Sequence, residues 1–262
     1  MYESMMKISG VPVTSRIKQV KQPRGGYINP KAFKSQSLGD GMDTLNPDEN
    51  VHASLIGLAV DYMTRFMSGT PATEAFKISI KGASIIHEES KATRLIAGVN
   101  GLDDDSVVNA VKLSGFDVVY RSGLMGYKSV DEINPDAPTI RNVRTMIERS
   151  LHFLDAYGPK VLDGFTFEGG YTCIVSAGDG DFTTSDTLWD FKVSRKPVSK
   201  ENTLQLLMYW RMGLHSIHPE FKNIRYLGVY NPRLNIVSRI AVADIPSDII
   251  SQVEHEVIGY NA

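Results

Sequence analysis

Gly178-Asp-Gly-Asp-Phe-Thr-Thr-Ser-Asp-Thr-Leu-Trp-Asp-Phe-Lys192 is the most informative segment of this 262-residue chain. Aromatic and polar side chains alternate along its two arms, a pattern typical of paired β-strands. A two-residue turn at Ser185–Asp186 closes such a hairpin and sets Phe182 opposite Trp189. The two rings then share one face, and we expect that face to be buried.

The other face of the predicted hairpin carries Asp181 and Asp190, and Lys192 joins them because side chains alternate with period two. Carboxylates directly opposite each other repel, at a cost of about 0.2–1 kcal/mol in an exposed setting. A hard dication between them removes this repulsion, and a nearby lysine can neutralise a phosphate or hold an attacking water. Phosphodiester hydrolysis needs this combination. A solvated hairpin with a polar outer face is the alternative interpretation.

A predicted helix follows the hairpin and carries Gln205 and Tyr209 on one face, since they are four residues apart. The residues around them are mostly apolar, so the helix is expected to be well buried. A buried amide and a buried hydroxyl need hydrogen-bond partners. Gln205 and Tyr209 either find these partners at the active-site face of the neighbouring strand, or they occupy ordinary positions at the boundary between core and solvent.

Together, Gly178-x-x-Asp181, Asp190-x-Lys192 and Gln205-x-x-x-Tyr209 resemble the motifs of the RecB-like branch of the PD-(D/E)XK nuclease superfamily, in the same order. The resemblance covers roughly residues 160–245. It implies a restriction-endonuclease-like core, in which a mixed β-sheet is flanked by helices. It also implies a metal-dependent nuclease that uses Mg²⁺ or Mn²⁺ to hydrolyse DNA, and the size of the chain favours a phage-type exonuclease. The catalytic residues implied are Asp181, Asp190, Lys192, Gln205 and Tyr209.

Asp181 and Asp190 are the metal ligands that the resemblance implies on the hairpin, and it also implies a ligand on an upstream helix. Asp61, four residues after Gly57, stands at the corresponding place. The alternative interpretation of Asp61 is a surface carboxylate on an amphipathic helix. Asp179 either pairs with the lysine of the hairpin or shares the metal.

Basic residues next to the hairpin are expected to bind DNA. Arg195, Lys196 and Lys200 follow the second strand directly, where they can contact the phosphate backbone. Further upstream, residues 16–34 contain six basic residues and no acidic one. This stretch is either a solvated arm or a segment that follows a phosphate backbone.

The order of the predicted elements indicates the α/β class. We expect an N-terminal arm over residues 1–47 and one nuclease domain over 48–262, with a helical part at 48–158 and the core at 159–262. Helices are predicted at residues 47–67 (capped by Asn46), 80–97, 106–113, 140–157, 204–214 and 247–258. Strands beyond the hairpin are predicted at residues 165–176, 226–230 and 235–242.

Composition excludes several classes of protein. The chain has no apolar run long enough to span a membrane and no secretory signal, so a cytoplasmic protein with no membrane partner is expected. The single cysteine, Cys173, cannot hold an iron–sulfur cluster. No phosphate-binding loop of the G-x-x-x-x-G-K-[ST] type is present, so no nucleotide cofactor is expected.

The formal net charge of −2 gives no general sign of nucleic-acid binding, so DNA must be held by a local patch or through metal ions. Two alternatives stay open at this point. One is a non-catalytic nucleic-acid-binding module of the same fold, and the other is an RNA nuclease. An oligomer is also possible.

Overall fold

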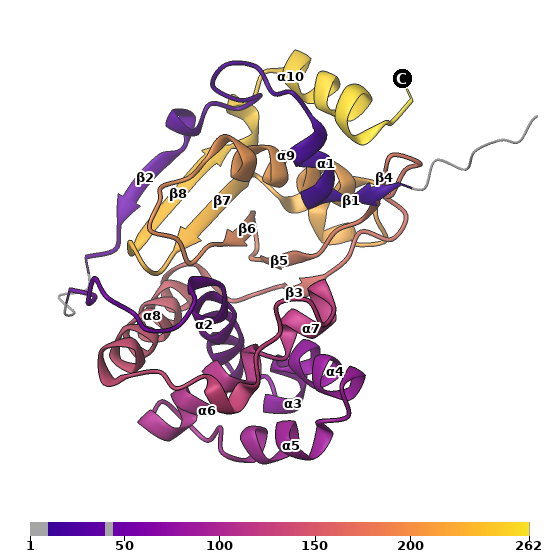
Figure 1. Cartoon of the computed structure of the whole chain (residues 1–262). Helices are drawn as coiled ribbons and strands as arrows, with labels where there is room; N and C mark the ends of the chain where they lie inside the picture. The colour runs from indigo at the N-terminus through magenta and orange to yellow at the C-terminus, as the bar shows by residue number, and fades with distance from the viewer. Residues whose placement is uncertain (1–9, 40–43, 262) are drawn as a thin grey trace, which may run out of the picture. The chain divides into compact units, whose positions relative to one another are not determined.

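The computed structural model describes residues 10–39 and 44–261 (Figure 1). These residues form two compact units. The sheet unit contains the described residues up to Leu38 together with the chain from Tyr157 onward, and the helical unit contains the described residues from Gly39 to Ala156. Residues 1–9 and 40–43 of the predicted arm lie outside the described residues.

The sheet unit is built on a mixed sheet whose described strands follow the order β2-β8-β7-β6-β5-β3. β6 and β7 pair in parallel and the other neighbours pair antiparallel. The predicted α/β class with a mixed sheet is therefore confirmed. The strand bounds are β2 Lys34–Ser37, β3 Leu162–Phe165, β5 Gly180–Thr183, β6 Thr187–Phe191, β7 Tyr226–Asn231 and β8 Ile236–Ala241.

A small parallel sheet of β1 (Val11–Pro12) and β4 (Val175–Ala177) accompanies the main one. The strand predicted over residues 165–176 is wrong, because the chain turns between β3 and β4 at Gly169, whose φ is +89°. The helices of this unit are α1 Val13–Gln19, η1 Pro30–Ala32, α9 Lys200–Leu214, η3 Pro219–Asn223, η4 Val242–Asp244, α10 Ser247–Gln252 and the π-helix η5 Val253–Ile258.

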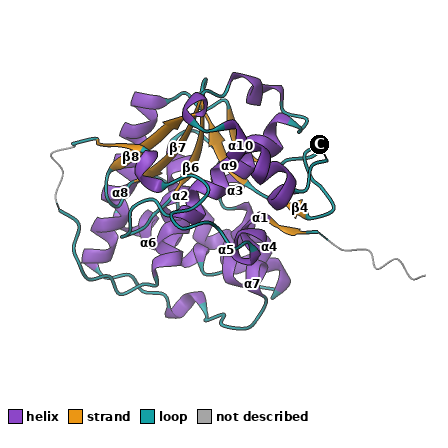
Figure 2. Ribbon diagram, turned by 90° about the horizontal axis from the view of Figure 1, so that it is seen from above, coloured by secondary structure: helices purple, strands orange, loops and turns teal. Residues whose placement is uncertain are grey.

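Helix α9 connects the parallel pair β6 and β7, which a tight turn cannot join. Its N-terminus is fixed by a capping box in which the Ser199 and Asn202 side chains each accept a bond from the other's backbone N–H. α9 packs against both strands, which Figure 1 and Figure 2 show beside it. Its apolar residues, with those of α1 and η5, form a buried cluster with the sheet that includes Leu188 and Leu227.

The predicted hairpin register is confirmed. Phe182 pairs with Trp189 across β5 and β6. The Thr184 N–H donates to the Thr187 carbonyl at 2.9 Å and closes the turn. The two aromatic rings are stacked with centroids 6.4 Å apart.

The helical unit corrects two predicted helices. The first helix begins at Ala53 with His52 as its N-cap, not near Asn46, whose side chain accepts from Asp48 N–H instead. The helix predicted over residues 80–97 is two helices, because His87 adopts a φ of +58° between them. The bounds are α2 Ala53–Met67, α3 Ala72–Ala75, α4 Lys77–Ile85, α5 Glu89–Ala97, α6 Asp104–Ser114, α7 Asp117–Ser122, η2 Val130–Glu132 and α8 Ala137–Tyr157. In the described chain, none of the helices combines the length and the apolar character needed to cross a bilayer.

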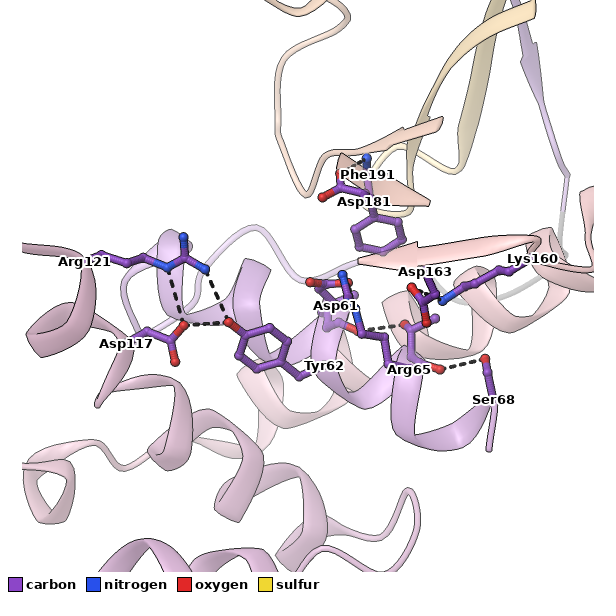
Figure 3. A network of polar contacts seen from close by, with 12 residues as sticks. Asp61, Tyr62, Arg65, Ser68, Asp117, Arg121, Lys160, Asp163, Asp181 and Phe191 are labelled. Atoms are coloured by element: carbon purple, nitrogen blue, oxygen red, sulfur yellow. Dashed lines mark hydrogen bonds and ion pairs between the residues drawn. The ribbon is translucent and has the colours of Figure 1, made fainter. Parts of the chain in front are cut away.

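A buried carboxylate lies at the centre of the helical unit (Figure 3). Asp117 is fully buried and accepts hydrogen bonds from Tyr62 Oη at 2.6 Å and Ser79 Oγ at 2.5 Å. Arg121 lies 3.5 Å from the same carboxylate. Burial raises the pKa of Asp117, although these three partners lower it. Ionisation of Asp117 therefore opposes folding.

We predict that Asp117→Asn changes stability in a pH-dependent way. A carboxyl whose pKa is raised on folding contributes stability below its ordinary pKa of 3.8, and this contribution is lost as the pH rises. The unfolding free energy of the variant minus that of the wild type should therefore increase as the pH rises above 3.8. Urea denaturation over a pH series measures this difference.

Asp136→Asn is the matched control, because hydrogen bonds from Thr139 lower the pKa of Asp136. The wild type should keep its advantage over this variant above pH 3.8 and lose it only as the pH falls further. A pH-independent difference for Asp117→Asn would contradict the assignment of an unfavourable buried charge.

Candidate active site

Asp190 is the most unusual residue of the sheet unit, because a carboxylate in the middle of a sheet is buried from solvent. Its side chain is 2% exposed, and Lys192 Nζ lies 2.8 Å from Oδ1. Its other oxygen, Oδ2, has no hydrogen-bond partner within the part of the chain that the structure describes. Buried polar atoms are rarely left in this state, which makes Asp190 Oδ2 a candidate atom for binding a ligand.

Asp181, Asp190 and Lys192 are brought together. Burial raises the pKa of Asp190, while the charge and hydrogen bond of Lys192 lower it, and Asp181 lies beside it. The Lys192 side chain is 33% exposed, so the buried Asp190 carboxylate is paired with a side chain that reaches solvent. The three residues therefore form one cluster on one face of the sheet.

Asp181 also fixes the end of the neighbouring strand. Its Oδ2 accepts a hydrogen bond from the Phe191 backbone N–H at 2.7 Å (Figure 3). The Asp181 carboxylate thus binds the backbone of the residue between Asp190 and Lys192. This hydrogen bond helps to fix the positions of Asp190, Phe191 and Lys192.

Tyr209 points from α9 into the same cluster. Burial raises its pKa most, and the charges of Asp190, Asp181 and Asp179 raise it further, against the lowering effect of a hydrogen bond with Gln205. Gln205 Nε2 lies 3.1 Å from Tyr209 Oη. Gln205 itself is only half-buried, whereas a well-buried amide was expected.

Gly178 packs closely against Val13 and Tyr209, which leaves little room for a side chain at this position. A Cβ atom at Gly178 would lie 3.1 Å from Val13 Cγ2 and 3.3 Å from Tyr209 Cε1. The Tyr171 hydroxyl donates to the Gly178 carbonyl at 3.2 Å. Two motifs far apart in the sequence therefore meet here, with the glycine of one against the tyrosine of the other.

A pocket of about 160 Å³ borders Lys192 on the same face of the sheet. Strand pairing extends a row of side chains from Asp190 across three more strands, through Val229, Ser238 and Ser35. The last three side chains line the pocket, as does Lys196. Ser35 Oγ and Ser238 Oγ are 2.8 Å apart. The pocket thus offers a mostly apolar wall together with two lysines, Lys192 and Lys196.

The loop after β6 carries the basic residues predicted to bind DNA, and Arg195, Lys196 and Lys200 are all exposed. Sequence analysis missed Asn231, which holds this loop. Its Nδ2 donates to the Ser194 carbonyl at 2.8 Å, and its Oδ1 accepts from Arg233 N–H at 3.0 Å. An Asn just before a Pro-Arg turn is a recognisable signal for such a side-chain turn.

Asp61, the predicted upstream metal ligand, lies on α2 of the helical unit, where Arg65 Nε is 3.1 Å from its Oδ1. Within the described residues there is no group of three or more His, Cys, Asp and Glu side chains that could hold a metal ion. The two aspartates of the sheet unit therefore form a pair of candidate ligands.

No protein-family model, no curated protein and no solved structure matches this chain. The case for a function therefore depends on the chemistry of these side chains.

We predict that Gln205 and Tyr209 stabilise the fold through one shared hydrogen bond. Gln205→Leu and Tyr209→Phe each remove it, so their effects on the unfolding free energy should not add. The double variant should lose about 0.5–1.5 kcal/mol less than the sum of the single variants. A double-mutant cycle by urea denaturation measures this coupling energy, and strictly additive effects would show that the two side chains act independently.

Proposed function

We propose that this protein is a metal-dependent nuclease that hydrolyses DNA phosphodiester bonds, with exonucleolytic action. The observation that carries the proposal is the buried Asp190 carboxylate, which has Lys192 on one oxygen, no described partner on the other, and Asp181 beside it. A buried charge with one oxygen unpaired reduces stability. Such an arrangement is expected at sites where that oxygen binds a ligand.

The donor set fits a hard dication. Asp181 and Asp190 would hold Mg²⁺ or Mn²⁺, because both ions prefer carboxylate oxygens and retain several waters, so two protein ligands are sufficient. When bound, the ion lowers the pKa of water and screens the charge of the phosphate.

The side chains around the aspartates have separate proposed roles. Lys192 presents a fixed positive charge to the phosphate as negative charge develops on its oxygens, and its pairing with Asp190 holds the ammonium in place. Tyr209 and Gln205 position the carboxylates from α9 through their shared hydrogen bond. Arg195, Lys196 and Lys200 bind the backbone of the DNA next to the site.

The arrangement of strands supports the further proposal of a restriction-endonuclease-like core. An antiparallel hairpin of β5 and β6 carries the aspartates, and α9 then leads to the parallel strand β7. This order of elements is the one that the motif resemblance implies. The chemistry at phosphorus is the same for RNA, so RNA belongs among the test substrates.

We predict that the protein degrades linear DNA in Mg²⁺ or Mn²⁺ and that EDTA stops the reaction. Lys192→Ala should reduce the rate about 10²–10³-fold with DNA binding nearly intact, because its charge acts on the transition state. Asp190→Asn should abolish both cleavage and the thermal stabilisation that Mn²⁺ gives the wild type. Time courses on linear, nicked and circular DNA and on RNA, together with melting curves, measure these effects.

Matched controls are the exposed residues Lys222 and Asp248. Lys222→Ala and Asp248→Asn remove the same kinds of charge and should leave cleavage unchanged. Cleavage by Lys192→Ala or Asp190→Asn at the wild-type rate would contradict the proposal. Salt-dependent binding without any cleavage would instead favour a non-catalytic binding module, and cleavage of RNA alone would favour an RNA nuclease.

A further inference from the structure

A second row of side chains crosses the sheet next to the row of the candidate active site. Trp189 on β6 pairs with Gly228, Gly228 pairs with Arg239, and Arg239 pairs with Lys34 on β2. Side chains directly opposite each other share a face, whereas neighbours along a strand point to opposite faces. This second row therefore lies on the face of the sheet opposite Asp190.

Arg239 is held in place by aromatic rings. Its guanidinium carbon lies 4.6 Å from the centre of the Tyr226 ring and 5.2 Å from that of Tyr157. The Trp189 ring is 5.9 Å away. Gly228 leaves room for the Trp189 ring between the strands, because a Cβ atom at position 228 would lie 2.5 Å from Trp189 Cε3. The guanidinium is thus preorganised by cation–π contacts, and its Nη1 also lies 3.5 Å from Thr187 Oγ1.

Lys34 places a second cation directly opposite Arg239. Two like charges in this relation destabilise a pair of strands, and neither residue forms an ion pair in the described part of the chain. Both line a pocket of about 440 Å³. Asp244 is the one acidic residue among the described residues that line it, so two cations face one carboxylate.

We propose that Lys34 and Arg239 bind a backbone phosphate of a nucleic-acid strand. A guanidinium presents two parallel N–H donors that match phosphate oxygens, and a bound phosphate removes the repulsion between the two cations. Tyr157 and Tyr226 line the same pocket, where their contacts with the guanidinium fix its position. The proposal rests on the proposed function for the identity of the partner as a nucleic acid, but it places a binding site on the other face of the sheet.

The test is the binding of a short fluorescein-labelled single-stranded oligonucleotide in EDTA, followed by anisotropy over a series of salt concentrations. Lys34→Ala and Arg239→Gln should each weaken binding on the order of tenfold at low salt. Each should also reduce the slope of log K against log salt by up to about 0.7, the value for one phosphate on a single strand. Lys222→Ala, which removes an exposed lysine outside this row, should change neither quantity.

A variant that is expected to bind more tightly distinguishes a direct effect on binding from a loss of binding caused by misfolding. Asp244→Asn removes the opposing carboxylate and should tighten binding, an effect that structural damage does not produce. Unchanged affinity and slope in Lys34→Ala and Arg239→Gln would overturn the proposal. Stabilisation of the fold by inorganic phosphate with unchanged oligonucleotide binding would also overturn it, because the site would then take only a free anion.

The two proposals fail separately. If the wild type cleaves DNA in Mg²⁺ while the Lys34 and Arg239 variants bind the oligonucleotide normally, only this inference fails. If the oligonucleotide binds as stated but no metal-dependent cleavage occurs, only the nuclease assignment fails.

Discussion

The pairing of Phe182 with Trp189 fixes the register of the β5–β6 hairpin, and the rest of the sheet unit depends on that register. Because side chains alternate along a strand, a slip by one residue would move Asp190 to the aromatic face and Trp189 to the face that α9 covers. The stacked rings and the closed turn at Thr184 oppose such a slip. One aromatic contact thus determines where a buried charge is placed.

The sheet carries two adjacent rows of side chains with different chemistry on its two faces. One row starts at Asp190 and ends in the pocket next to Lys192, and the other starts at Trp189 and ends at Lys34. Parallel pairing of β6 with β7 is what continues both rows across the sheet. The proposed hydrolytic site and the proposed phosphate site therefore lie on opposite faces of the same strands.

Burial of the Asp190–Lys192 pair has a cost in stability. Taking a carboxylate out of water costs several kcal/mol, and a partly exposed lysine offsets only part of that cost. Replacing a buried ion pair with apolar side chains of similar volume is often neutral or stabilising. Asp190 Oδ2 has no described partner, and under the proposed function a metal ion bound there would offset this cost.

The sequence by itself determined the hairpin and its register, the helix carrying Gln205 and Tyr209, and the mixed α/β class, because alternation, turn residues and helical spacing are local properties. It misplaced helix boundaries at Asn46, whose backbone bonds the Asn142 side chain, and at His87, whose φ of +58° separates two helices. Only the tertiary structure decided that Asp190 is fully buried, that Gly178 packs on Tyr209 and that Lys34 faces Arg239. Each of these depends on segments far apart in the chain, and their pairing is set by the burial of surfaces that no local pattern specifies.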